Sequence, residues 1–181
     1  VRETDGEQAI LIVTHDGMSI SFRETDVRCM GRDAAGVRGI RLREGDYVIG
    51  AARAKHDHQV LMVTENGYGK RTGMDEYFRA DGPQNRGGYG LKGYQVTDKT
   101  GPIAGVKVVD ENDDIFIISD DGVIIRMSVK DINIYSRFAQ GVILMRLQEG
   151  VKVISIARTE HEEETENPAE SEESGEEDEQ P

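Results

Sequence analysis

Three stretches of the chain repeat one pattern of apolar and polar positions: QAILIVTHDGMSISFR (8–23), QVLMVTENGYGKRT (59–72) and DIFIISDDGVIIRM (114–127). Each begins with an apolar run, continues through Thr or Ser into a polar turn that ends in glycine, and resumes as a second extended run. An Asp-Gly or Asn-Gly pair between such runs is the strongest short-range signal for a β-hairpin, because the turn requires positive φ. The pattern therefore predicts three hairpins.

Each hairpin is followed by a second matching block: GVRGIRL (36–42), GLKGYQV (90–96) and GVILMRL (141–147). A turn glycine and another apolar run come next, so each unit holds four extended segments in about fifty residues. β-branched residues fill the runs, and helical periodicity is limited to a possible turn over 129–132. The repeat predicts an all-β, propeller-like fold of four-stranded blades. The expected blades are 8–57, 58–112 and 113–159, with 1–7 as the end of a preceding blade or a linker.

Three blades are too few to close a propeller ring, which usually needs four or more. An open arc would leave two sheet edges unpaired, and natural proteins rarely tolerate such edges. We therefore expect these repeats to belong to a larger ring or to close with a partner.

The charge is divided unevenly along the chain. The formal net charge is −13, yet the last 22 residues (160–181) hold twelve acidic and no basic residues. Residues 1–159 are nearly neutral, with 23 acidic and 22 basic side chains. The acidic segment has too few apolar residues to form a core, so a disordered tail is expected over 160–181.

Other features narrow the class of protein. The single cysteine, Cys29, excludes a disulfide framework and is expected to be a partly buried thiol. No run of 18 apolar residues and no leader are visible, so we expect a cytosolic protein without a membrane partner. The HDH triplet (56–58) and DENDD (110–114) do not form metal sites, because the first falls on a polar turn and the second lacks the required glycine. No metal site and no catalytic residue are predicted.

The loop PQNRGGYGLKG (83–93) contains the pattern G-x-G-x-x-G, but it lacks the strand before and the helix after that a nucleotide site requires. Two interpretations stay open: a glycine-rich connection without a ligand, or a loop that faces a phosphate. The second is favoured because Arg32, Arg86 and Arg137 each precede the matching repeat glycine by no more than five residues. Glycine allows a close backbone approach, and arginine supplies a bidentate partner.

The segment QNRGGYG (84–90) resembles the gyrase-A box, whose pattern is Gln, basic, Arg, Gly, Gly, basic, Gly. Asn85 and Tyr89 stand where the family has basic residues; the other five positions match. With ENGYGKRT, MGRDAAGVRGIRL and RFAQGVILMRL, the chain is similar to the C-terminal domain of bacterial DNA gyrase A proteins over residues 8–158. The resemblance implies a six-bladed β-pinwheel whose blades exchange strands and whose rim binds and bends DNA. This chain would supply the last three blades and the tail.

The resemblance also implies a role and partners. The expected function is a non-catalytic DNA-binding and DNA-wrapping module of a type IIA topoisomerase that introduces negative supercoils. Its partners would be double-stranded DNA, the rest of gyrase A, and gyrase B in an A2B2 assembly in the cytoplasm, associated with the nucleoid. No cofactor is expected in this chain; ATP and Mg²⁺ would act elsewhere in the holoenzyme. Two alternatives stay open: the related domain of topoisomerase IV, and a propeller-type protein-interaction module without a nucleic-acid role.

The predicted contacts are mostly to phosphates, which position DNA without reading its sequence. A further hypothesis is that the acidic tail competes with DNA for these residues. The predicted DNA-binding residues are Arg23, Arg28, Arg32, Arg38, Arg41, Lys70, Arg71, Arg79, Gln84, Arg86, Gly87, Gly88, Gly90, Lys92 and Arg137.

Overall fold

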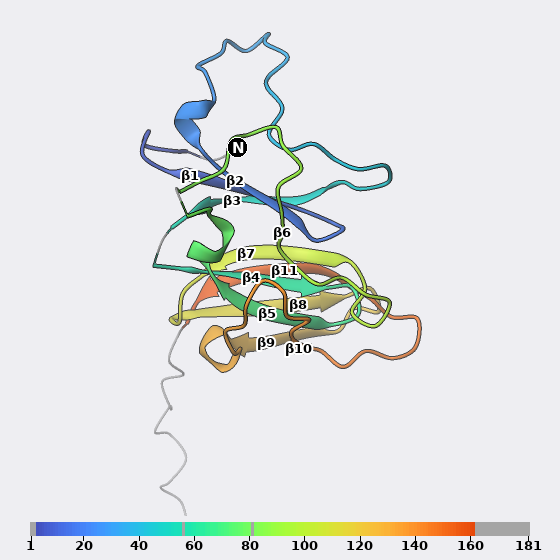
Figure 1. Ribbon diagram of the computed structural model, residues 1–181. Coiled ribbons are helices and arrows are strands. Elements are labelled where there is room, and N and C mark those ends of the chain that lie inside the picture. The colour runs from blue at the N-terminus through green and yellow to red at the C-terminus, as the bar shows by residue number, and fades with distance from the viewer. Residues whose placement is uncertain (1–2, 56, 81, 162–181) are drawn as a thin grey trace, which may run out of the picture.

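The computed structural model describes residues 3–55, 57–80 and 82–161, and these form three successive antiparallel sheets (Figure 1). The all-β class expected from the repeats is confirmed. The strands are β1 (Ala9–Thr14), β2 (Met18–Arg23), β3 (Val48–Ala54), β4 (Gln59–Thr64), β5 (Tyr68–Gly73), β6 (Leu91–Lys92), β7 (Ile103–Val109), β8 (Asp113–Ser119), β9 (Ile124–Ser128), β10 (Val142–Ile143) and β11 (Val153–Glu160).

The three predicted hairpins are β1–β2, β4–β5 and β8–β9. Their turn glycines, Gly17, Gly67 and Gly122, have φ of 80°, 78° and 87°, which the polar turn requires. The strands β3, β7 and β11 pair antiparallel with the first strand of each hairpin. All three pairings contain a register shift near one end. The three repeats therefore share this local irregularity as well as their strand order.

The fourth strand of a sheet comes from the following repeat. Strand β6 lies beside β2, and β10 lies beside β5, so the sheet orders are β3-β1-β2-β6 and β10-β5-β4-β7. The N–H groups of Gly93 and Tyr94 both donate to the carbonyl of Gly17, and those of Leu144 and Met145 donate to Gly67. The strand exchange implied by the family resemblance is therefore present between successive repeats.

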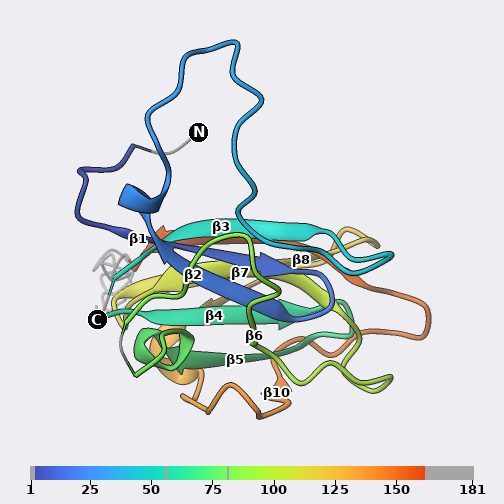
Figure 2. The ribbon, with the colours of Figure 1, turned by 45° about the horizontal axis from the view of Figure 1, so that its top comes forward.

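The ends of the array differ from its middle. Among the described residues the third sheet has three strands, in the order β11-β8-β9. The block 36–42, which corresponds to β6 and β10, forms no strand here and lies in a long segment, 27–46, that extends away from the sheets (Figures 1 and 2). The four-stranded expectation thus holds for two sheets, because the third receives no strand from a following repeat.

The core lies between neighbouring sheets. Leu11, Val13, Met62 and Tyr94 belong to one buried cluster, which joins the first and second repeats. A second cluster, with Leu61, Ile117 and Met145 among its members, joins the second and third. Tyr94 and Met145 each lie two residues after the end of an exchanged strand, so burial of these two side chains fastens each repeat to the one before it.

Several local features differ from the expectations. The turn expected over 129–132 is one of three equivalent 3-10 turns: η1 (Glu24–Asp26), η2 (Met74–Tyr77) and η3 (Val129–Asp131). Cys29 is exposed rather than partly buried, because it lies in the segment that extends from the sheets. Glu160, assigned to the tail, ends β11, and the rest of the expected disordered tail from residue 162 lies outside the described residues. None of the helices in the described part of the chain has the length and apolarity to cross a membrane.

Candidate nucleic-acid interface

Seven of the predicted cationic contacts have exposed side chains. None of the seven forms an ion pair with another residue of the described ranges. Exposed cations without acidic partners are the groups that a phosphate backbone can neutralise. We call these residues the exposed basic set: Arg23, Arg28, Arg32, Arg38, Arg41, Arg79 and Lys92.

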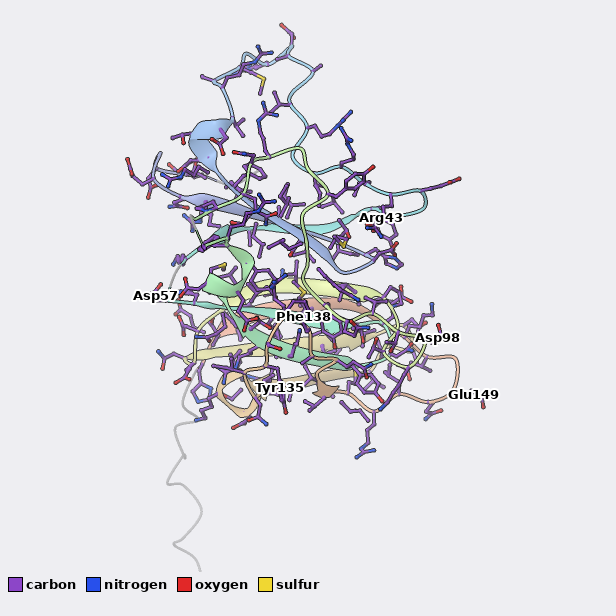
Figure 3. All side chains as sticks on the ribbon, in the orientation of Figure 1. Arg43, Asp57, Asp98, Tyr135, Phe138 and Glu149 are labelled. Atoms are coloured by element: carbon purple, nitrogen blue, oxygen red, sulfur yellow. The ribbon has the colours of Figure 1, made fainter. Side chains whose placement is uncertain are left out.

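Most of this set belongs to the segment 27–46. Four of the seven lie on it, and Figure 3 labels Arg43, a further exposed arginine, where the segment leads into β3. The segment has no strand partner in the described chain; Ile40 packs against Ile20 and Phe22 of β2, while the four arginines of the set that lie on the segment are exposed. Repeat one therefore presents the highest density of available positive charge.

Tyr89 contacts one of these cations, Arg41, at the loop that contains the box-like segment 84–90. The guanidinium carbon of Arg41 lies 5.3 Å from the ring centroid of Tyr89, and the N–H of Arg41 donates to the carbonyl of Gly88 at 2.7 Å. An arginine over an aromatic face is stabilised by the ring quadrupole. The position at which the family has a basic residue is thus occupied by a tyrosine that holds an arginine from the preceding repeat.

Two predicted contacts, Lys70 and Arg71, are corrected by their burial: their exposed fractions are 0% and 4%. The Nζ of Lys70 donates to the carbonyls of Ser136 and Arg137 at 2.6 and 2.7 Å, and burial lowers its pKa to about 8. Arg71 donates to the carbonyls of Ile132 and Lys130. A buried cation must find acceptors inside the protein, so these two side chains join the second repeat to the third instead of facing DNA.

Gln84 and Gly90 also take part in the contact between the first and second repeats. Gln84 is 4% exposed; its backbone N–H donates to the carbonyl of Ser21, and its side-chain amide donates to that of Tyr77. Gly90 has φ of 75° and crosses β2 so closely that a Cβ would lie within 3.0 Å of the carbonyl oxygen of Ser19. These contacts show that both residues help to position the loop against the preceding repeat.

Of the other matching residues of the box, Gly87 and Arg86 contact the protein, and Gly88 is exposed. The N–H of Gly87 donates to the carbonyl of Gly39 at 2.5 Å, while Gly88 is exposed. Arg86 is partly buried and donates from its guanidinium to the carbonyls of Asp26 and Arg38.

In the third repeat several cations are paired with carboxylates. Arg126 lies 2.6 Å from Asp114, and Arg158 lies 3.2 Å from Asp113. Arg137, which corresponds to Arg86, is partly buried and donates to the carbonyl of Lys92 at 2.8 Å. The third repeat therefore offers less free positive charge than the first.

One group of side chains within the described ranges has the spacing of a metal site. Ligand atoms of His15, Asp16 and Asp46 lie within 4.8 Å of one another. However, Oδ1 of Asp46 already accepts the N–H groups of Asp16 and Tyr47, and the ring of His15 stacks on that of Tyr47 at 4.5 Å. These contacts stabilise the turn, and the turn explains why the three side chains lie close together.

The model of one protein family, described as the DNA gyrase C-terminal domain, beta-propeller, matches this chain three times, over residues 8–55, 58–110 and 113–160. These matches cover most of the chain. The chain belongs to this family. The three matched segments correspond to the three sequence repeats, and the second and third contain the strands β6 and β10 that join the preceding sheet.

Curated relatives agree with this assignment. The DNA gyrase A protein of Staphylococcus epidermidis is 44% identical over 164 residues, which is 90% of this chain and 18% of the relative. The DNA gyrase A protein of Staphylococcus aureus is 43% identical over 169 residues, 92% of this chain and 19% of the relative. The chain thus spans less than a fifth of these proteins.

Two solved structures share the fold. The C-terminal domain of DNA topoisomerase IV matches with a TM-score of 0.79 and 28% identity, covering 87% of this chain and 48% of that one. The DNA gyrase A C-terminal domain matches with a TM-score of 0.77 and 26% identity, covering 86% of this chain and 52% of that one. Coverage of about half of each domain agrees with the expectation of three repeats out of six.

Proposed function

We propose that this chain is a non-catalytic module that binds duplex DNA through its backbone and wraps it as part of DNA gyrase. The observation that carries the proposal is the exposed basic set, seven cations on the loops and strand ends of repeats one and two without acidic partners among the described residues. Membership of the gyrase C-terminal domain family supports it independently.

The mechanism is electrostatic. Successive cations neutralise phosphates along a curved surface, and these contacts offset the energy needed to bend the duplex. Smooth bending of a 20–30 bp site by 40–90° costs on the order of 1–6 kcal/mol. A few phosphate contacts can supply that amount, and because they read no base edges, binding is indifferent to sequence.

The number of residues in the exposed basic set gives an expected salt dependence of DNA affinity. Each neutralised phosphate contributes about −0.9 to the slope of log affinity against log salt concentration. If all seven residues of the exposed basic set contact phosphates, the slope approaches about −6. Had Lys70, Arg71, Arg86 and Arg137 contributed as well, it would approach about −10.

The test is a titration of the full chain with two unrelated 30-bp duplexes between 50 and 200 mM salt. We expect equal affinities for both duplexes and a slope no steeper than about −6. Replacing Arg28 and Arg32 together with alanine should make the slope shallower by about 1.8. Absence of any salt-dependent binding at 50 mM would contradict the proposal and favour a protein-interaction module.

The acidic tail is proposed to compete with DNA for the exposed basic set, because it places many carboxylates on the same chain as these cations. Removal of residues 162–181 should then tighten DNA binding at low salt and make bending more extensive. Equal affinity with and without these residues would refute competition.

Family membership supports a proposal about the partners. We propose assembly with the remainder of gyrase A and with gyrase B as A2B2 in the bacterial cytoplasm, at the nucleoid, with ATP and Mg²⁺ acting outside this chain. The two solved relatives score alike, so topoisomerase IV remains the alternative. A supercoiling assay on the complete enzyme separates the two, since only gyrase introduces negative supercoils.

A further inference from the structure

Arg86 and Arg137 make the same contact in two different repeats. Each stands four residues before its repeat glycine, Gly90 or Gly141. Each donates from Nη1 to the carbonyl of the residue that lies two positions after the glycine of the preceding repeat. For Arg86 this is Arg38, at 3.2 Å, and for Arg137 it is Lys92, at 2.8 Å. A contact that recurs at equivalent positions is a property of the repeat.

The first of these arginines closes the base of a loop. Besides Arg38, Arg86 binds the carbonyl of Asp26 through Nε at 2.9 Å. Asp26 and Arg38 flank the outer part of the segment 27–46, whose two limbs rise from the sheets in Figure 2. Two backbone hydrogen bonds lie beside the guanidinium: Gly87 to the carbonyl of Gly39, and Arg41 to that of Gly88. The guanidinium therefore joins both limbs of this loop to the second repeat.

The second arginine, Arg137, is held through its backbone as well as its guanidinium, although its Nε is buried without a hydrogen-bond partner among the described residues. Its N–H donates to the carboxylate of Glu76 at 2.8 Å, and its carbonyl accepts from the buried Nζ of Lys70 at 2.7 Å. Its guanidinium carbon lies 4.8 Å from the ring centroid of Phe138. Glu76 and Lys70 thus fix the backbone of Arg137, and its guanidinium reaches the carbonyl of Lys92 from that fixed position.

Both acceptor carbonyls belong to exposed cations. We propose that Arg86 and Arg137 are positioning residues, which set the location of Arg38 and Lys92 on the surface through their backbones and are not principal phosphate contacts themselves. Arginine suits this role because its planar fork can address two carbonyls from one side chain, whereas the lysine ammonium is a point charge on a flexible stem. The link to DNA rests on the proposed function; the contact between repeats does not.

The contact is tested first without DNA, by amide hydrogen exchange in the full chain. In Arg86→Ala and Arg86→Lys, exchange at Gly87 and Arg41 should accelerate about tenfold or more, since a hydrogen bond from a charged group contributes about 1.5–3 kcal/mol. The amide of Val153, which donates to Glu65 in another part of the fold, serves as the reference and should keep its rate. Arg79→Lys, at an exposed arginine, is the matched control and should change neither rate. Unchanged exchange at Gly87 and Arg41 in both Arg86 variants would overturn the proposal.

The consequence for DNA is tested with a double-mutant cycle of Arg86→Lys and Arg38→Ala. If Arg86 positions Arg38, Arg86→Lys weakens binding although the charge is kept, by no more than Arg38→Ala does. It should have no further effect once Arg38 is alanine. If Arg86 instead contacts a phosphate, Arg86→Lys retains affinity. Arg86→Ala then makes the slope of log affinity against log salt concentration shallower by about 0.9, even in the Arg38→Ala background. That result would overturn the positioning role. Failure of the unmodified chain to bind DNA would refute the proposed function and leave the exchange test standing.

Discussion

Replacement of Gly90 by alanine tests whether the close crossing of β2 requires a glycine at this position. In the structure this residue has φ of 75°, and a Cβ at this position would lie within 3.0 Å of the carbonyl oxygen of Ser19 in the preceding repeat. An L-residue in the left-handed region costs about 1–2 kcal/mol. A forced shift of packed backbone adds about 1–3 kcal/mol. Gly90→Ala should therefore lower the free energy of unfolding by about 2–5 kcal/mol.

The chain contains its own controls for this substitution. Gly36 is the equivalent glycine of repeat one, with φ of 80°, but a Cβ there would meet nothing within 4 Å. Gly36→Ala should therefore cost only the conformational part, about 1–2 kcal/mol. Gly141 has φ of 73° and crosses β5 as closely as Gly90 crosses β2, so Gly141→Ala should resemble Gly90→Ala.

The assay is urea unfolding followed by far-UV circular dichroism, with the three variants and the unmodified chain measured side by side. A change of midpoint without a change of m-value reports stability alone. Gly90→Ala should exceed Gly36→Ala by about 1–3 kcal/mol, which is the part due to close approach. Equal losses at Gly36 and Gly90 would refute the argument that strand crossing requires the glycine.

Two other predictions concern a buried cation and an exposed thiol. Burial lowers the pKa of Lys70 from 10.5 to about 8. Between these values the unfolded chain binds more protons than the folded one, so stability should rise with pH. From pH 8 to 9.5 the unmodified chain should gain at most about 2 kcal/mol relative to Lys70→Met, with no relative change below pH 7. Parallel urea midpoints of the two proteins across this range would contradict the prediction. Cys29 is exposed beside Arg28 in the segment 27–46, so bound duplex should slow its alkylation by maleimide several-fold at 50 mM salt. An equal rate with and without DNA would place the duplex elsewhere.

The hairpins were predictable because their signals are local. Alternating apolar runs and an Asp-Gly or Asn-Gly turn lie within about fifteen residues, and the repetition of the pattern removes much of the ambiguity of each copy. The exchanged strands are different. Strand β6 has two residues and forms only because β2 of another repeat lies beside it. The equivalent block 36–42 has a similar sequence and forms no strand, so the block alone does not determine its structure.

The candidate site was predictable as a distribution of charge but not side chain by side chain. Lys70 and Arg71 lie in the polar sequence YGKRTG, which is typical of an exposed strand. In the structure β5 is enclosed by β4, by β10 and by the loop over 130–137, so both cations are buried. The common spacing of Arg32, Arg86 and Arg137 was visible in the sequence. The acceptors of Arg86 and Arg137 were not visible, because carbonyl groups carry no signal in the residue type.

The position two residues after the repeat glycine links the fold to the proposed DNA path. Arg38 and Lys92 occupy it in the first two repeats, and Ile143, 45% exposed, occupies it in the third. The third repeat still exposes Lys130 and Arg146, but it lacks a cation at the position that a following arginine would hold. On the proposed path, a duplex would therefore gain its regularly placed contacts over repeats one and two. Over repeat three fewer contacts offset the bending energy, so the duplex should follow the surface most closely where Arg38 and Lys92 stand.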